Sequence, residues 1–126
     1  MKSSSKGFTL SELLLAAAIL AFALSGLLLL FVNCMLLNAA NRNLTIATSH
    51  AEFALEEIEN TTFASIASAT WNNATITSKG LTPLNNESIV ITVTGTDLKN
   101  ISVLASWLDR GQKNRSTELL TLFSDY

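Results

Sequence analysis

Cysteine, proline and histidine are almost missing from this chain of 126 residues, which contains one of each. A single cysteine, Cys34, excludes an intrachain disulfide, so an exported domain must fold by packing alone. With one histidine, His50, and one distant cysteine, the chain also lacks the ligands of a zinc site and a Cys–His nucleophile pair. We interpret His50 as a packed or solvated helix residue, and we expect no metal and no cofactor.

Charge is scarce as well, because charged residues make up 14% of the chain and the net charge is −2. This balance gives no overall basic field, which argues against nucleic acid as a partner. The sequence has no glycine-rich phosphate loop and no clustered run of calcium ligands, so we expect neither a small-molecule substrate nor an enzyme. A small basic cluster is expected to be a solvated turn, with contact to DNA at a filament tip as the weaker alternative: Arg110, Lys113 and Arg115.

What the chain does have is a long apolar run that follows a short basic leader and ends near Leu37. About 20 apolar residues span a bilayer, and residues 13–31 supply them, with Ser25 and Gly26 as the one weak point of the predicted helix. An ordinary signal peptide has an apolar region of about 7–15 residues, which is much shorter. A plain membrane anchor does not explain Glu12, because a carboxylate within a membrane helix costs up to about 3 kcal/mol and usually has a partner.

The segment Lys6-Gly7-Phe8-Thr9-Leu10-Ser11-Glu12 and the apolar run after it resemble the N-terminus of type IV prepilins and of type II secretion pseudopilins. The resemblance implies that prepilin peptidase cuts between Gly7 and Phe8 and that Phe8 becomes an N-methylated terminus. It also implies that Glu12 meets the terminal amine of a neighbouring subunit during assembly. The alternative for Glu12 is a first-turn helix residue favoured by the helix dipole.

The expected fold is α+β and pilin-like, with a long N-terminal helix from Phe8 to Asn60 packed on a small antiparallel sheet. The predicted parts are a cleaved leader (1–7), a transmembrane and assembly helix (8–37) and a periplasmic domain (38–126). Within this domain we expect an amphipathic helix (38–60), a connecting loop (61–87) and antiparallel strands (88–126). The apolar residues that recur every three or four positions in this helix are predicted to face the sheet: Leu44, Ala47, Ala51, Ala54, Leu55 and Ile58.

Alternating apolar residues predict strands at 88–94, 101–108 and 115–123, with turns at 95–100 and 109–114. The last two strands also resemble the C-terminal hairpin of minor pilins of the PilV-like type, which favours a structural minor subunit of a type IV pilus. The alternatives are a minor pseudopilin of a type II secretion system and a membrane-anchored binding module that never polymerises. The expected partners are prepilin peptidase/methyltransferase, other pilin or pseudopilin subunits and inner-membrane lipid. The N-terminus is expected in the cytoplasm and the C-terminal domain in the periplasm, before transfer to the filament.

Overall fold

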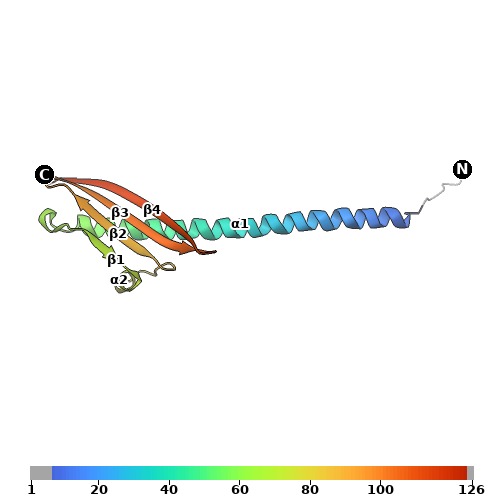
Figure 1. Cartoon of the computed structure of the whole chain (residues 1–126), viewed down its shortest axis with the longest axis horizontal. Helices are drawn as coiled ribbons and strands as arrows, with labels where there is room; N and C mark the ends of the chain where they lie inside the picture. Colours follow the sequence, from blue (N-terminus) through green and yellow to red (C-terminus); the bar gives the residue numbers. More distant parts are fainter. Residues whose placement is uncertain (1–6, 125–126) are drawn as a thin grey trace. The chain divides into compact units, whose positions relative to one another are not determined.

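The computed structural model describes residues 7–124, which form two compact units, one ending at Asn38 and the other beginning at Ala39. A single helix, α1 (Leu10–Glu59), contributes residues to both units. The second unit adds a sheet and a short helix to its part of α1 (Figure 1). These elements confirm the predicted α+β arrangement of one long N-terminal helix and a small antiparallel sheet.

Helix α1 is continuous because its sequence supplies strong helix formers and no proline. It continues through Ser25 and Gly26, where the Ser25 hydroxyl donates to the carbonyl of Ala21 at 2.8 Å. At the C-terminal end the amides of Asn60 and Thr61 donate to the carbonyls of Glu56 and Ile58. The helix therefore ends close to the predicted Asn60, and by length and composition it can cross a membrane.

The sheet has four antiparallel strands in the order β1-β2-β3-β4, which is a meander. The strands are β1 (Ala69–Trp71), β2 (Ser88–Thr94), β3 (Leu98–Asp109) and β4 (Lys113–Ser124). Their register aligns the predicted apolar positions, since Ile91 pairs with Val103 and Val103 with Leu119. The predicted strand 88–94 is confirmed, whereas β3 and β4 each extend beyond the predicted ends.

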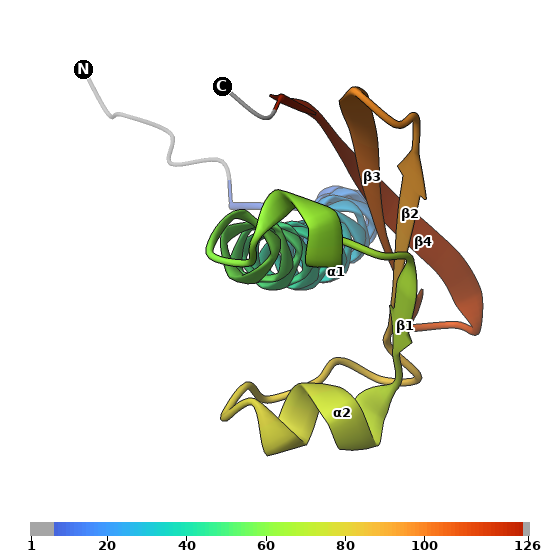
Figure 2. The ribbon, with the colours of Figure 1, turned by 90° about the vertical axis from the view of Figure 1, so that its left-hand side faces the viewer.

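The second unit has its core between one face of the sheet and α1, which lies along that face (Figure 2). Ala47, Ala51 and Ala54 of the helix are fully buried, and their small side chains let the backbone approach the sheet closely. The sheet contributes the branched and aromatic residues of the core: Ile89, Ile91, Ile101, Val103 and Trp107. Leu44 was expected on this buried face, but it remains 44% exposed because it lines an open hollow between α1 and the β3–β4 hairpin.

The connecting segment 61–87 is not a plain loop, and this part of the prediction is wrong. It contains the 3₁₀ turn η1 (Phe63–Ser65), the strand β1 and the helix α2 (Asn73–Ser78). Helix α2 begins where the Asn72 side chain accepts a hydrogen bond from the amide of Thr75 at 3.0 Å. Ile76 from this helix is fully buried, so the segment closes one side of the core.

The two hairpin connections are shorter than predicted, because pairing continues almost to the turns. Gly95 has a φ of 97°, and a Cβ at this position would lie 2.1 Å from the carbonyl oxygen of Leu98. In the β3–β4 connection Gly111 and Gln112 have φ of 84° and 62°. At Gly95 both the positive φ and the nearby carbonyl of Leu98 require a glycine, whereas at Gly111 only the positive φ favours one.

Candidate assembly site at the N-terminal helix

Gly7 and Phe8 precede the first turn of α1 and have no regular secondary structure. The Phe8 side chain is 86% exposed, and a Cβ built on Gly7 would meet nothing within 4 Å. The peptide bond between them is therefore open to another protein. The remainder of the predicted leader, residues 1–6, lies outside the described residues.

Glu12 lies in the first turn of α1 and forms a reciprocal cap with Thr9. Its Oε2 atom accepts from the Thr9 amide at 2.9 Å and from the Thr9 hydroxyl at 3.0 Å. The Glu12 amide in turn donates to the Thr9 hydroxyl at 3.3 Å, which completes a capping box. In the single chain the Glu12 carboxylate therefore has partners of its own, which the sequence interpretation had not anticipated.

The helix after Glu12 exposes a continuous apolar surface in the single chain. Its large side chains are roughly half to fully accessible, from 47% at Val32 to 85% at Phe22, and Cys34 is exposed among them. Soluble proteins rarely expose apolar patches larger than a few hundred Å², so such a surface needs lipid or other subunits around it. The same helix can thus serve as a membrane anchor and as a packing surface.

The comparisons with known proteins bear on this segment. Residues 2–28 match the family model described as the prokaryotic N-terminal methylation motif. No curated protein and no solved structure in the comparisons matches the chain.

This match supports a type IV prepilin-like pilin or pseudopilin. The motif implies processing by prepilin peptidase and assembly with other pilin subunits, and it indicates a structural subunit rather than an enzyme. With the apolar helix, it supports a membrane-anchored protein that enters a filament.

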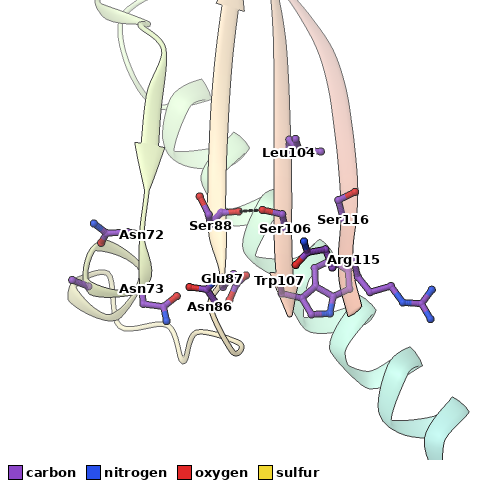
Figure 3. Close-up of a pocket in the computed structure, with 12 residues that line it drawn as sticks. Asn72, Asn73, Asn86, Glu87, Ser88, Leu104, Ser106, Trp107, Arg115 and Ser116 are labelled. Carbon is purple, nitrogen blue, oxygen red and sulfur yellow. Dashed lines mark hydrogen bonds between the residues drawn. The ribbon is translucent and has the colours of Figure 1, made fainter. Parts of the chain in front are cut away.

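The second unit of this pilin-like protein carries a polar hollow of about 650 Å³ near one end of the sheet (Figure 3). Three serines from neighbouring strands line it, and the Ser106 hydroxyl donates to the carbonyl of Ser88 at 3.3 Å. Its one carboxylate belongs to Glu87, which is already bound to other groups. Within residues 7–124 no cluster of three His, Cys, Asp or Glu side chains could hold a metal ion.

His50 is buried and bound to Glu87, a contact that joins α1 to the residues just before β2. Its Nδ1 atom lies 2.9 Å from Oε1 of Glu87, while Oε2 of Glu87 accepts from the amide of Leu84 at 2.6 Å. His50 was predicted to be either packed or solvated, and it is packed; its acidic partner was not predicted. His50, Glu87 and the Leu84 amide are thus bound to one another within the second unit, and we interpret this contact as one that stabilises the fold.

The basic residues of the last hairpin lie on the exposed side of the β3–β4 turn. Arg110 and Lys113 are exposed, and the Nε of Arg115 lies 3.8 Å from Oδ2 of Asp109. Asp109 is mostly covered, and its Oδ1 accepts from the Asn43 side chain at 3.0 Å and from the Arg110 amide at 2.9 Å. The hairpin is thus fixed to the helix, and its cations extend into solvent.

Proposed function

We propose that this protein is a structural minor subunit of a type IV pilus or a related filament. The observation that carries the proposal is the methylation motif together with the apolar helix that continues beyond it, whose large side chains are 47–85% exposed. The small domain, the lack of a disulfide and the β3–β4 hairpin support a minor role. In this proposal the leader is 1–7, the transmembrane and assembly helix 8–37 and the periplasmic domain 38–126.

Prepilin peptidase cuts between Gly7 and Phe8 in this proposal, and Phe8 is then N-methylated. The exposed bond between these residues and their lack of regular structure favour access by a protease. Mass spectrometry of the mature protein is expected to give a terminal methyl-Phe8. An intact Met1, or a cut after the apolar run, would show that the protein is not processed as a prepilin.

Glu12 is proposed to exchange its bonds to Thr9 for the terminal amine of a neighbouring subunit. Two variants separate this role from helix capping, because Gln can replace Glu in a capping box but carries no charge. Both Glu12→Ala and Glu12→Gln are expected to insert into the membrane normally and to be lost from sheared filaments. Glu56→Ala, which removes an exposed acid from the second unit, is the matched control.

The outcome for Glu12→Gln decides between the two roles. If this variant assembles normally while Glu12→Ala fails, the carboxylate acts only as a cap. If both assemble normally, the proposed charge contact is wrong. A filament recovered from the cell surface would distinguish a pilus from a secretion pseudopilus, and the absence of this chain from any filament would favour an unpolymerised binding module.

A further inference from the structure

The charges of the second unit are separated along its length. Four of its cations gather at the end where α1 enters from Asn38, and we name them the basic collar: Arg42, Arg110, Lys113 and Arg115. Among the described residues, two acids lie at this end: Asp109, and Glu87, which is buried and bound to His50. The other acids of the unit lie farther along α1 and the sheet: Glu52, Glu56, Glu57, Glu59, Asp97 and Glu118.

The direction of β3 brings the hairpin cations to the level of Arg42. At the start of the strand, Nζ of Lys99 donates to the carbonyl of Ile66, 3.1 Å away, beyond the end of α1. At its finish, Asp109 accepts from Asn43, near the point where α1 enters the unit. The strand β3 therefore runs back along α1, from the C-terminal end of the helix toward the part that contains Asn43 (Figure 1).

Chain connection alone places this end of the unit next to the apolar run. That run ends at Leu37, and Arg42 follows Asn38 by four helical residues, a rise of about 6 Å. The headgroup layer on each side of a bilayer is about 5–8 Å thick. The apolar run is longer than the about 20 residues that a span needs, and with the span at its C-terminal end, residues 18–37, Arg42 lies within the headgroup layer.

A hollow of about 240 Å³ between the helix and the hairpin combines donors with an apolar wall. Arg115, Ser116 and Asn41 line it with hydrogen-bond donors. Trp107 also borders it, and its buried Nε1 has no acceptor in the part of the chain described. Asp109 also lines it, with Oδ1 already bound to Asn43 and to the Arg110 amide. Ala40 and Leu44 provide the apolar wall, which gives a reason for the exposure of Leu44.

We propose that the basic collar binds the phosphate of anionic phospholipids at the membrane surface, with the hollow holding one headgroup. Arginine and lysine near an anionic leaflet attract it, and surplus N–H and O–H donors suit phosphate oxygens. The rival occupant is the acidic stripe of another subunit, Glu52, Glu56, Glu57 and Glu59. The apolar wall and the closeness to the membrane exit favour lipid, and the proposal requires the membrane anchor but not the filament role.

The test uses the full-length chain in bilayers that contain spin-labelled phosphatidylglycerol or phosphatidylcholine. The association of each labelled lipid with the protein is measured by electron spin resonance at low and high salt. The native chain is expected to prefer phosphatidylglycerol, and salt is expected to weaken this preference. The triple variant Arg110→Gln/Lys113→Gln/Arg115→Gln should lose it several-fold, since one basic residue near the surface contributes about fivefold in affinity.

Lys79→Gln is the matched control, because it removes a cation far from the collar and should keep the preference. Far-ultraviolet circular dichroism checks that each variant remains folded, because Lys79 lies over the Trp71 ring and Arg115 lines the same hollow as Trp107, so tryptophan fluorescence would change directly. A folded triple variant that retains the full preference would overturn the proposal, as would a native chain with no preference. Cross-linking of the collar to Glu52 or Glu56 of another subunit tests the rival occupant. If the triple variant loses this cross-link but keeps its lipid association, the acidic stripe is the occupant and the lipid assignment is wrong.

Discussion

The buried pair of His50 and Glu87 gives the sharpest test of how the second unit is held together. Only 2% of Glu87 and 6% of His50 remain exposed, and the Nδ1–Oε1 distance is 2.9 Å. Glu87 also accepts from the Leu84 amide, so one carboxylate satisfies a side chain of α1 and the backbone before β2. We expect this side chain to be worth more to stability than any single exposed ion pair.

The change Glu87→Leu removes the acceptor and leaves two buried donors without a partner. Breaking a buried pair from one side costs about 3–5 kcal/mol, which is a large share of the roughly 5–15 kcal/mol stability of a typical domain. Replacing both members by apolar residues is much less costly, because no unpaired polar side chain remains. The double variant His50→Leu/Glu87→Leu is therefore expected to be more stable than Glu87→Leu alone.

The assay is urea unfolding of the full chain in detergent, followed by tryptophan fluorescence. Both tryptophans of the protein, Trp71 and Trp107, lie in the second unit, so the signal reports this unit and not the membrane helix. The free energy of unfolding is measured for the native chain, His50→Leu, Glu87→Leu and the double variant. These four values form a double-mutant cycle, with an expected coupling of at least about 1 kcal/mol. If the double variant loses as much stability as the two single variants together, the pair is not coupled and the reasoning is refuted.

Three further predictions use the same unfolding measurement. Gly95→Ala should destabilise the second unit by about 1–3 kcal/mol, because the new Cβ meets the Leu98 carbonyl. Gly111→Ala should cost less, because a Cβ at this position meets nothing within 4 Å. Equal losses would contradict the role of the Leu98 carbonyl. Ile101→Val should cost about 0.5–1.5 kcal/mol because Ile101 is fully buried, and a neutral result would show a loosely packed core. Leu120→Ala should stay within about 0.5 kcal/mol because 69% of Leu120 is exposed, and a larger loss would show that this surface is covered.

The sheet was largely predictable because its signal is local. Strict alternation in Ser88–Thr94 places Ile89 and Ile91 on the buried face, and the structure has these bounds. The ends of β3 and β4 were not predictable to the same degree, because polar residues such as Asn100 and Asn114 pair through their backbones. Alternation reports which face is buried, whereas pairing at a strand end depends on the partner strand.

The segment before β2 was missed for a different reason. Strand β1 has three residues, of which only Trp71 is buried, so no alternation can be seen in its sequence. Helix α2 did leave a signal, because an Asn at position 72 before a run without Gly or Pro is typical of a helix N-cap. Its six residues are too few for a helical period, and tertiary burial of Ile76 stabilises it instead.

The N-terminal motif could be read directly because its residues are neighbours in the chain. The pair of His50 and Glu87 could not, since 37 residues separate its members and no rule of composition joins them. The basic hairpin lies between these cases, because its cations were visible in sequence while their position beside the first turns of α1 in the second unit depends on the contact of Asn43 with Asp109. Contacts at short sequence separation were thus predictable, and contacts set by the packing of α1 on β3 were not.

The cap formed by Thr9 and Glu12 changes the expected energetics of assembly. A carboxylate without partners would gain strongly from any neighbouring amine, but in the single chain Glu12 accepts two hydrogen bonds from Thr9. The proposed cut between Gly7 and Phe8 would leave these bonds in place, because it removes neither the amide nor the hydroxyl of Thr9. In the proposed assembly a neighbour's amine must therefore compete with the cap, and the gain comes from charge rather than from hydrogen bonding alone. On this proposal the Glu12 contact selects the register, while the exposed apolar surface supplies the larger contact area for association.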